Sequence, residues 1–421
     1  MAIVRPRGVN DFLPADTAKW RVVETLLHQM CAEYGFGEIR TPIFEETELF
    51  ARGVGENTDI VQKEMYTFTD LGGRSMTLRP EFTASLCRAY IENKLYGQPQ
   101  PQKLYCMGPL FRYERPQAGR FRQFHQFNIE IIGTVSPLAD AEIITFVWDL
   151  YHRLAINGLI LRLNSVGCPE CRAVYRAALQ DYLRPNLSGL CPTCQDRFTR
   201  NPMRILDCKN EVCRGISAAS PRITGYLCAE CAEHFAMVKQ YLDFCGIPYS
   251  LDSSMVRGLD YYTKTVFEIC VEGIGAQSAL CGGGRYDGLI AMIGGPPTPA
   301  VGVALGMERI FVALAAQDDE INAGQGIDVF VVTDFAAAAA VQQAFALTGE
   351  LRQSGMRTAM DYENKSFKAQ FKTANRLQAS HTVIVGGEEA AKGVAQVKNM
   401  ASGEQVELPT AQVRQYLQSE K

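Results

Sequence analysis

The stretch MVRGLDYYTKTVFEI is the first that suggests chemistry. Residues 265–271 are rich in β-branched and aromatic side chains, which predicts a buried strand. Directly before this strand stand Arg257, Gly258 and the phenols of Tyr261 and Tyr262. A guanidinium stays charged and can grip phosphate or carboxylate oxygens with two parallel hydrogen bonds, and glycine lets a backbone pass close to a ligand. The group is therefore a candidate binding site, although the tyrosines also fit ordinary packing on a strand.

The segment GRFRQFHQFNIEIIG offers a second candidate on one of its two faces. Side chains alternate across a strand, so its apolar and polar residues separate. The apolar set is Phe127, Ile129 and Ile131, and the polar set is Gln126, Asn128 and Glu130. An antiparallel strand with one dry and one wet face explains this alternation, and so does a strand whose polar face lines a binding site.

The preceding segment, LYCMGPLFRYERPQAGR, extends the polar face. Arg112 and Glu114 share one side of the expected strand. Pro116 and Gly119 mark a loop that turns this strand back onto the next as an antiparallel hairpin. The two charged side chains are therefore expected to lie on the same sheet face as the polar set.

Three shorter fragments carry weaker signals. TLRPEFTASLCRAY places Glu81 and Thr83 beside a proline that stops a strand, and GVALGMERIF places Arg309 in a run that opens a helix. CGGGRYDG contains Tyr286 and matches neither GxGxxG nor a P-loop, so its glycines could equally form a tight turn.

Eight of the 14 cysteines fall in one region as four pairs. In chain order the pairs are Cys168/Cys171, Cys191/Cys194, Cys208/Cys213 and Cys228/Cys231. The first two pairs have the spacing of a four-cysteine structural zinc site, and the last two would make another. Reduced thiols in a small helical insert are the alternative interpretation.

Composition limits the class of protein. A chain with 47% hydrophobic and 21% charged residues has the balance of a soluble globular protein. No apolar run approaches the ~18 residues that span a bilayer, and the N-terminal segment has no secretory core, so cytoplasmic residence is expected. The net charge of −4 does not indicate a nucleic-acid binder, although local basic patches matter more than the total.

The framework that must position these residues is read from periodicity. Apolar spacing predicts helices at 16–34 and 140–154, strand-like runs over 38–133 and about 250–279, and a helix that begins near Met307.

The C-terminal part alternates regularly. After a polar segment, the strand IDVFVV is followed by a helix at 335–353, a strand at 357–361, a helix at 366–379 and a strand at 382–385. This βαβαβ order predicts a compact α/β domain with a largely parallel sheet.

With these pieces assembled, the chain resembles the histidyl-tRNA synthetases, a class II aminoacyl-tRNA synthetase family, over essentially its whole length. RGVNDFLP and PIFEETELFARGVGE resemble the N-terminal and dimer-forming region. FRYERPQAGRFRQFHQ and GVALGMERI resemble class II motifs 2 and 3. MVRGLDYYTKTVFEI and CGGGRYDGL resemble the two signatures that separate the histidine enzymes from other class II families, and they make the match specific.

The resemblance implies a fold and domain boundaries. It implies an α+β catalytic domain built on an antiparallel sheet, a small cysteine-rich insert and a C-terminal α/β anticodon-binding domain. The expected ranges are 1–167 and 241–318 for the catalytic domain, 168–240 for the insertion domain, 319–326 for the linker and 327–421 for the anticodon-binding domain. A homodimer is implied as well.

The implied reaction joins L-histidine to ATP, giving histidyl-adenylate and pyrophosphate, and then passes the histidyl group to the 3′ end of tRNA(His). Arg112 and Arg257 are the implied catalytic residues at the α-phosphate, and Arg309 holds the distal phosphates. Glu114 lies near adenine. Mg²⁺ accompanies ATP and bridges phosphate oxygens.

Histidine recognition requires polar partners for two ring nitrogens and an ammonium group. The residues implied for histidine binding are Glu81, Thr83, Gln126, Glu130, Tyr261, Tyr262 and Tyr286. Among them, Glu130 and Tyr262 are assigned to the imidazole. Such a site leaves its polar groups unpaired when an apolar amino acid enters, so it rejects wrong substrates without an editing domain.

The tRNA is expected to meet the chain at two places. Arg115 and Gln117 are implied at the acceptor end, and the C-terminal domain is implied to read the anticodon. A basic stripe at the start of and along the helix at 366–379 could contribute, although a solvated face is the plain alternative. Its residues are Lys365, Lys368, Lys372 and Arg376.

One departure and two alternatives accompany the resemblance. Phe82 stands where the family commonly has a smaller residue, so it is expected to narrow the amino-acid pocket. A catalytically inactive, histidine-binding regulatory paralogue is the first alternative, but it would lack the C-terminal domain and the phosphate-binding arginines. A zinc-dependent nucleic-acid-binding protein is the second, and it leaves the arginines unexplained.

Overall fold

The computed structural model describes residues 2–55, 58–117, 119–272, 278–318, 320–322, 324 and 326–420. Its internal contacts divide the chain into two compact units, Met1–Ile321 and Asn322–Lys421. The expected division of the first unit into a catalytic domain and an insertion domain stays a prediction. Among the described residues, no helix has the length and apolar character needed to cross a bilayer.

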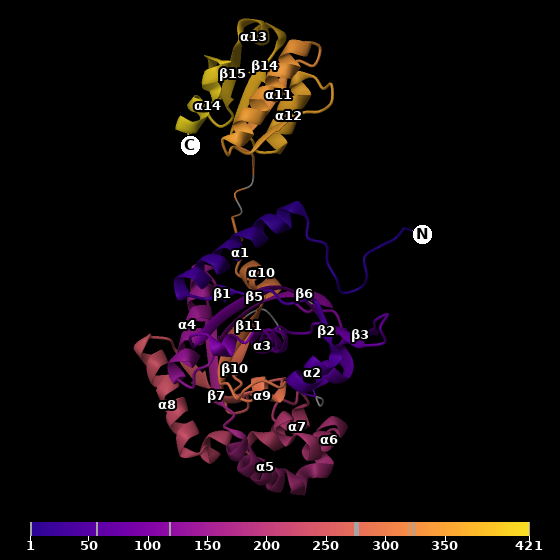
Figure 1. The fold of residues 1–421 in the computed structure, drawn as a ribbon, viewed down its shortest axis with the longest axis vertical. Helices are drawn as coiled ribbons and strands as arrows, with labels where there is room; N and C mark the ends of the chain where they lie inside the picture. Colours follow the sequence, from indigo (N-terminus) through magenta and orange to yellow (C-terminus); the bar gives the residue numbers. More distant parts are fainter. Residues whose placement is uncertain are drawn as a thin grey trace. The chain divides into compact units, whose positions relative to one another are not determined.

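The first unit is built on an eight-stranded sheet with the order β1-β5-β6-β11-β10-β9-β7-β8 (Figure 1). The strands are β1 (Gly37–Glu38), β5 (Gln102–Phe111), β6 (Gln123–Ile132), β7 (Leu159–Ser165), β8 (Tyr249–Leu251), β9 (Thr263–Val271), β10 (Ala279–Arg285) and β11 (Ala300–Gly306). Only the two edge pairings, β1 with β5 and β7 with β8, are parallel. The expected antiparallel sheet and the hairpin between β5 and β6 are therefore confirmed.

One face of this sheet is closed by four helices. They are α1 (Pro14–Tyr34), α4 (Pro137–Arg153), α8 (Ala229–Phe244) and α10 (Met307–Ala315). The apolar set of β6 packs into this core, together with alternate residues of β9 and β11. Burial of these side chains supplies the main stabilisation of the unit and directs the polar set of β6 to the opposite face.

The opposite face is only partly covered. The helices α3 (Thr83–Glu92) and α9 (Leu289–Met292) pack there in a second core with Phe82, which is 1% exposed. Phe82 lies under the guanidinium of Arg79, whose Cζ is 4.5 Å from the ring centroid. The expectation that Phe82 narrows the pocket is wrong, because its ring is buried in this core and does not line the cavity described below.

A three-stranded sheet, β2-β4-β3, lies beside α2 (Thr47–Val54). Its strands are β2 (Phe44–Glu46), β3 (Tyr66–Thr69) and β4 (Ser75–Leu78), and the π-helix Ile60–Glu64 precedes β3. Large apolar side chains of this region remain exposed, including Phe44 at 52% and Phe68 at 45%, with their ring centroids 6.4 Å apart.

The cysteine-rich segment forms a helical layer with its own small core. Its elements are α5 (Pro169–Leu183), the 3₁₀ turns Arg184–Gly189, Pro202–Ile205 and Ile223–Tyr226, α6 (Pro192–Arg200) and α7 (Glu211–Ala218). Helices α5, α6 and α7 group together in Figure 1, and the chain then enters α8, which packs against α4.

The second unit is a five-stranded sheet with the order β13-β12-β14-β15-β16. Its strands are β12 (Val329–Thr333), β13 (Thr358–Met360), β14 (His381–Val385), β15 (Val394–Asn399) and β16 (Gln405–Pro409). The α11 (Ala338–Gln353) and α14 (Thr410–Ser419) helices pack on one face, α12 (Phe367–Arg376) packs on the other, and α13 (Gly387–Lys392) precedes β15. The α/β prediction is confirmed, but the sheet is parallel only across β13, β12 and β14, because β15 and β16 add antiparallel pairs.

A buried ion pair joins the sheet to its covering helices. Arg285 at the end of β10 and Asp140 on α4 have side chains that are both 0% exposed. The Arg285 Nε lies 3.2 Å from Asp140 Oδ2, and its Nη1 donates to the carbonyl oxygen of Thr134 at 2.8 Å. His234 of α8 places its Nε2 3.2 Å from Asp140 Oδ1, so one carboxylate connects three elements.

We expect the Asp140→Asn variant to be destabilised by about 3–5 kcal/mol, because removing one partner leaves a buried, uncompensated guanidinium. Thermal unfolding of the variant and of the wild-type protein measures this effect. Asp149→Asn is the matched control on the same helix, because its partly exposed ion pair with Arg153 is worth at most about 1 kcal/mol. Equal destabilisation by the two substitutions would contradict the assignment.

Candidate active site

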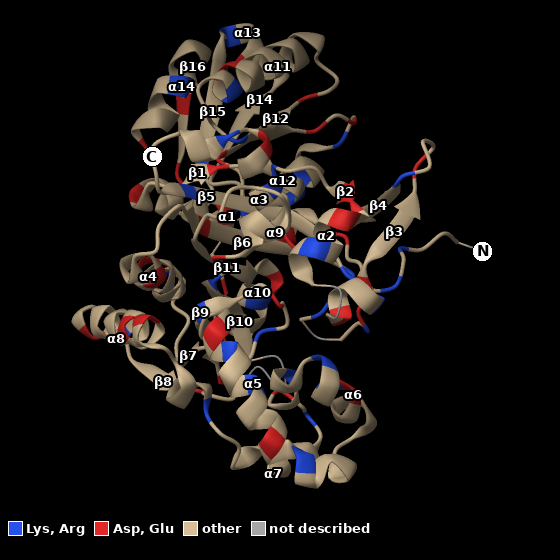
Figure 2. Cartoon of the chain, turned by 60° about the horizontal axis from the view of Figure 1, so that its bottom comes forward, with Lys and Arg blue, Asp and Glu red and all other residues tan. Residues whose placement is uncertain are grey.

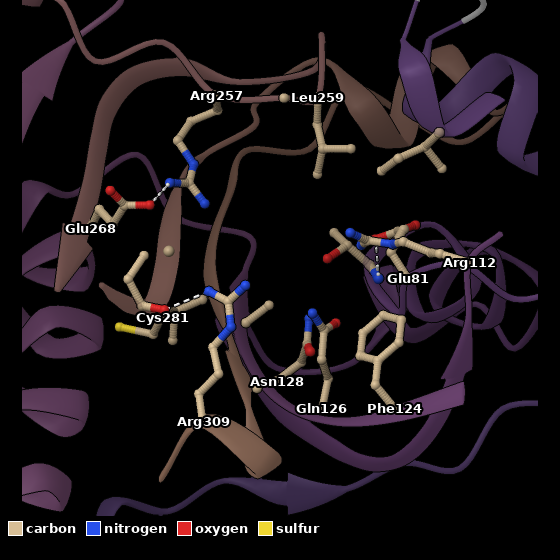
Figure 3. A pocket seen from close by; sticks show the side chains of 18 of the residues that line it. Glu81, Arg112, Phe124, Gln126, Asn128, Arg257, Leu259, Glu268, Cys281 and Arg309 are labelled. Carbon is tan, nitrogen blue, oxygen red and sulfur yellow. Dashed lines mark hydrogen bonds and ion pairs between the residues drawn. The ribbon is translucent and has the colours of Figure 1, made fainter. Parts of the chain in front are cut away.

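A cavity opens on the polar face of the eight-stranded sheet. Strands β6, β9, β10 and β11 form its floor, and the loop after β5, the segment before β9 and the first turn of α3 form its walls. Figure 3 shows side chains from these separate elements pointing into one space. The polar face of β6 therefore lines this cavity, through Gln126, Asn128 and Glu130.

Three arginines reach this cavity from distant parts of the sequence (Figure 3). Arg112 follows β5 and donates from Nε to the carbonyl oxygen of Pro80 at 2.8 Å. Arg257 precedes β9 and donates from Nη1 to Glu268 Oε1 at 3.1 Å. Arg309, in the first turn of α10, donates to the carbonyl oxygen of Ala279. The structure therefore brings together the three arginines that the sequence suggests.

Arg257 also shows why a further ligand would be favourable. Its Nε is buried and has no hydrogen-bond partner among the described residues, and an unsatisfied buried donor costs free energy. A guanidinium has five N–H groups, so a single carboxylate leaves most of them available. An anion in the cavity would satisfy them.

Glu81 and Glu130 form the acidic part of the cavity and are both almost fully buried. Glu81 accepts hydrogen bonds from the backbone N–H groups of Thr83 and Ala84, both at 2.7 Å, at the start of α3. Glu130 accepts from Thr83 Oγ1 at 2.9 Å and from Tyr286 Oη at 2.7 Å. Burial raises the pKa of the Glu81 carboxyl and raises the pKa of the Glu130 carboxyl to about 7.

Two amide side chains add unpaired acceptors beside these carboxylates. Gln126 Oε1 and Asn128 Oδ1 are buried and have no hydrogen-bond partner within the part of the chain that the structure describes. Buried polar groups are normally satisfied, so these oxygens mark places for donors of a bound ligand. Asn128 lies on the predicted polar face but was not among the expected site residues.

The glycine triplet 282–284 of CGGGRYDG lies in strand β10 and not in a tight turn, so the turn interpretation of the triplet is wrong. A Cβ on Gly282 would lie 1.9 Å from Arg257 Nη2. On the neighbouring strand, a Cβ on Gly302 would lie 1.5 Å from Glu130 Oε2. A side chain at either position would displace a charged group of the cavity, Arg257 or Glu130.

Three tyrosines close one end of the cavity. Tyr261, Tyr262 and Tyr286 are each less than 10% exposed, and the ring centroid of Tyr261 lies 4.8 Å from that of Tyr262 and 5.6 Å from that of Tyr286. Tyr286 is the hydrogen-bond donor to Glu130, and Tyr262 is one of the residues that line the cavity.

The loop between β5 and β6 separates the remaining candidates. Glu114 lines the cavity, 3.9 Å from Arg112 Nη1 and 3.2 Å from Arg120 Nη1. Arg115 and Gln117 are exposed and do not line it. Their expected contact with tRNA stays a prediction.

Glu268 was missed by the sequence analysis, although it holds Arg257 in place. The available signal was a single carboxylate within the apolar run VFEIC. A lone charge in a strand that is otherwise buried usually has a partner, and Arg257 is one of the two cationic side chains that precede the predicted strand.

The cysteines group differently from their order along the chain. One group holds Cys168, Cys171, Cys228 and Cys231, and the other holds Cys191, Cys194, Cys208 and Cys213. The expected set of Cys168 and Cys171 with Cys191 and Cys194 is therefore wrong. The reason is the path of the chain. The end of the segment returns to its beginning, so the first cysteine pair meets the last, and the two middle pairs meet each other.

The fold is that of a class II aminoacyl-tRNA synthetase. The profile described as Histidyl-tRNA synthetase matches residues 8–187 and 208–310, and the profile described as Anticodon binding domain matches residues 327–420. The chain belongs to the histidyl-tRNA synthetase family.

Relatives agree with this placement. The chain is 55% identical to the histidine–tRNA ligase of Desulforamulus reducens over 97% of each chain. It is 53% identical to that of Desulfitobacterium hafniense over 97% of this chain and 96% of the relative. Among solved structures, it is similar to the apo S. aureus histidyl-tRNA synthetase with a TM-score of 0.85, at 40% identity and over 99% of this chain and 100% of that chain.

The buried Glu130 should give the protein an unusual pH dependence of stability. Its carboxyl has a pKa of about 7 in the folded chain, against about 4.3 when unfolded. Below both values it is neutral in both states, so burial of its charge costs nothing. As the pH rises from about 4.3 to about 7, the unfolded state releases this proton while the native state keeps it, so stability is lost by up to about 4 kcal/mol.

We therefore expect the stability of Glu130→Gln relative to the wild-type protein to rise between pH 5 and pH 7 and to level off above pH 7. Melting temperatures of both proteins across that range measure the difference. Glu92→Gln, at an exposed position of α3, is the control and should show no such trend. A constant difference between Glu130→Gln and wild type at every pH would refute the raised pKa.

Proposed function

We propose that the chain activates L-histidine with ATP to form histidyl-adenylate and transfers the histidyl group to the 3′ end of tRNA(His). The observation that carries this proposal is the meeting of Arg112, Arg257 and Arg309 around one cavity that also holds the buried Glu81 and Glu130. Cationic groups at one end and carboxylates at the other suit a triphosphate beside an amino acid.

In the activation step, the carboxylate of histidine attacks the α-phosphate of ATP and pyrophosphate leaves. Negative charge develops on the phosphate oxygens, so catalysis depends on positioning and on fixed positive charge. Arg112 and Arg257 would stabilise that charge from opposite walls, and Arg309 would bind the distal phosphates. The guanidiniums suit this task because their planar forks match phosphate geometry.

Recognition of histidine would use the acidic part of the cavity. Glu130, oriented by Thr83 and Tyr286, would accept a hydrogen bond from one imidazole nitrogen, and the hydroxyl of Tyr262 would meet the other. Glu81, Thr83 and the unpaired Gln126 oxygen would receive the α-ammonium, with Tyr261 as a wall. An apolar amino acid would leave these groups unpaired, which opposes its binding.

ATP would enter as its magnesium complex. Mg²⁺ prefers oxygen ligands and is usually held by one or two carboxylates together with substrate phosphates. Glu114 and Glu268 provide such carboxylates among the three arginines, so the residues of the cavity fit this form of the substrate.

The chain's features favour an enzyme over the regulatory alternative. A histidine-binding regulator would be expected to lack the anticodon-binding domain and the phosphate-binding arginines. The match of residues 327–420 to an anticodon-binding profile and the clustered arginines both support the enzyme.

Histidine-dependent exchange of labelled pyrophosphate into ATP tests the activation step. Arg257→Ala should lower its rate by about 10²- to 10³-fold, because one preorganised charge is removed from the reacting centre. Arg153→Ala, which removes an exposed arginine of α4, should leave the rate unchanged. An absence of exchange in the wild-type protein, or near-normal exchange in Arg257→Ala, would refute the proposal.

The second unit is expected to contact the anticodon. Lys368, Lys372 and Arg376 are exposed along α12, whereas Lys365 is paired with Asp361 and Glu363. Figure 2 shows basic residues on α12. Single-stranded bases and their phosphates require such positive charge together with stacking surfaces.

We expect the Lys368→Glu/Lys372→Glu variant to charge tRNA(His) with kcat/KM lowered by about tenfold or more. The reason is that two positive side chains expected to contact tRNA phosphates become negative. Pyrophosphate exchange should stay at the wild-type rate, since the cavity is untouched. Lys392→Glu on α13 is the matched control. Equal charging by the double variant and the control would remove α12 from the tRNA surface.

The enzyme is expected to act in the cytoplasm.

The first unit is expected to pair with the first unit of a second copy of the chain. Exposed apolar side chains on and around the three-stranded sheet support the pairing, because contiguous apolar patches mark interaction surfaces. They are Ile43, Phe44, Phe68 and Leu71.

Light scattering should give twice the mass of one chain for the wild-type protein and a lower mass for Phe44→Asp/Phe68→Asp. A monomeric wild-type protein would refute the dimer.

A further inference from the structure

The eight cysteines of the helical layer converge in two separate groups. Within each group, all four Sγ atoms lie within 4.8 Å of one another. Cys168 Sγ lies 3.4 Å from Cys171 Sγ and 4.0 Å from Cys228 Sγ, and Cys191 Sγ lies 3.9 Å from Cys208 Sγ. A tetrahedral ion with Zn–S bonds of about 2.3 Å places its sulfurs about 3.8 Å apart, whereas a disulfide requires about 2.05 Å.

The backbone around these sulfurs fits thiolate ligands. Cys168, Cys191 and Cys228 are the N-cap residues of α5, α6 and α8, so their partners three positions later lie in the first turn of each helix. The positive end of a helix stabilises a thiolate there. Backbone N–H groups also point at the sulfurs, from Cys228 to Cys171 Sγ at 3.0 Å and from Cys191 to Cys213 Sγ at 3.2 Å.

We propose that the chain binds two structural zinc ions, each through four cysteine thiolates. The neck site consists of Cys168, Cys171, Cys228 and Cys231, and the distal site consists of Cys191, Cys194, Cys208 and Cys213. Each ion replaces the four thiol protons of its site, which are released to solvent. Four sulfur ligands leave no open position, so both sites are structural and take no part in the reaction.

The neck site lies next to residues that hold the cavity wall. Arg172 follows Cys171 directly and donates from Nη1 to the carbonyl oxygen of Tyr262 at 3.1 Å. Glu230, between Cys228 and Cys231, places Oε1 2.7 Å from Lys264 Nζ. Zinc at the neck would therefore fix both groups that hold the start of β9, where Tyr262 enters the cavity.

The distal site supports the same wall from further along. It brackets α6 and the 3₁₀ turn Pro202–Ile205, where Asn201 donates from Nδ2 to Asp260 Oδ1 at 3.2 Å. Arg204 places Nη2 3.7 Å from Asp59 Oδ2. The helical layer thus contacts the segment that carries Arg257 and Tyr262, and zinc would set the shape of the contacting surface.

Metal analysis of the full-length protein, purified without chelator, tests the proposal. Two equivalents of zinc per chain are expected, and both should be released when an organomercurial titrates the thiols. Zinc below background, a single equivalent, or iron with visible absorption would each overturn the two-site assignment. This count is independent of the proposed synthetase activity, so its failure leaves that proposal standing.

Paired substitutions test which cysteines share an ion. Cys168→Ser/Cys228→Ser should keep one zinc, because both residues belong to the neck site, whereas grouping in chain order predicts that none is kept. Cys168→Ser/Cys191→Ser should lose both ions, whereas the chain-order grouping keeps one. Cys245→Ser, which removes an exposed cysteine outside both groups, should keep two.

Hydrogen exchange tests the link to the cavity wall. Cys228→Ser, which removes the most exposed neck ligand, should speed exchange of peptides that cover 260–266, because Lys264 N–H donates to the Gly167 carbonyl oxygen at 2.9 Å beside the neck. Cys208→Ser should speed exchange near 201–206 with a smaller effect at 260–266. Unchanged exchange at 260–266 in Cys228→Ser would refute the positioning role, even where the zinc count agrees.

Discussion

The molecule depends on holding several charged side chains away from water on one face of a sheet. A buried charge without a partner costs several kcal/mol, so each of these groups must be satisfied before any ligand arrives. Glu81 is held by two backbone N–H groups of α3, Arg112 by the carbonyl oxygen of Pro80, and Arg257 by Glu268. Most of these partners are backbone groups or strand side chains, and they fix the geometry of the cavity. The unpaired oxygens of Gln126 and Asn128 and the unpaired Nε of Arg257 are then what a bound ligand would complete.

Burial of apolar side chains on the opposite face of the sheet offsets the free-energy cost of these buried charges. Helices α1, α4, α8 and α10 bury the apolar residues of β6, β9 and β11, and that burial anchors the strands whose alternate residues form the cavity floor. The floor itself must be thin. Arg257 and Glu130 lie where side chains at Gly282 and Gly302 would stand. Glycine has a low strand propensity, but in β10 and β11 it leaves the space that these two charged groups occupy.

Local patterns predicted much of this cavity. The alternation of β6 identified its polar face, turn residues identified the β5–β6 hairpin, and three arginines were chosen correctly as neighbours. Features that depend on distant packing were missed. Helix α3 was hidden because Pro80 suggested only the end of a strand, yet its first N–H groups bind Glu81. The glycines of β10 fitted a turn because no local signal shows what a neighbouring segment places above them. Strands β15 and β16 were missed because the regular alternation ended before them.

The cysteines were also misgrouped because their arrangement depends on distant packing. Their role follows from the small size of the helical layer. Sequence spacing grouped the pairs in chain order, whereas the path of the chain returns to the sheet and brings the first pair to the last. Between them lies a short segment whose core is small. A single core in a segment of this length supplies only about 3–5 kcal/mol, and natural domains of that size often rely on a metal or disulfides. A cross-link at the neck closes the whole segment into one loop, and a second cross-link within it shortens the remaining free chain. The layer contacts Asp260 and the carbonyl of Tyr262, so rigidity gained far from the sheet is transmitted to the wall of the cavity.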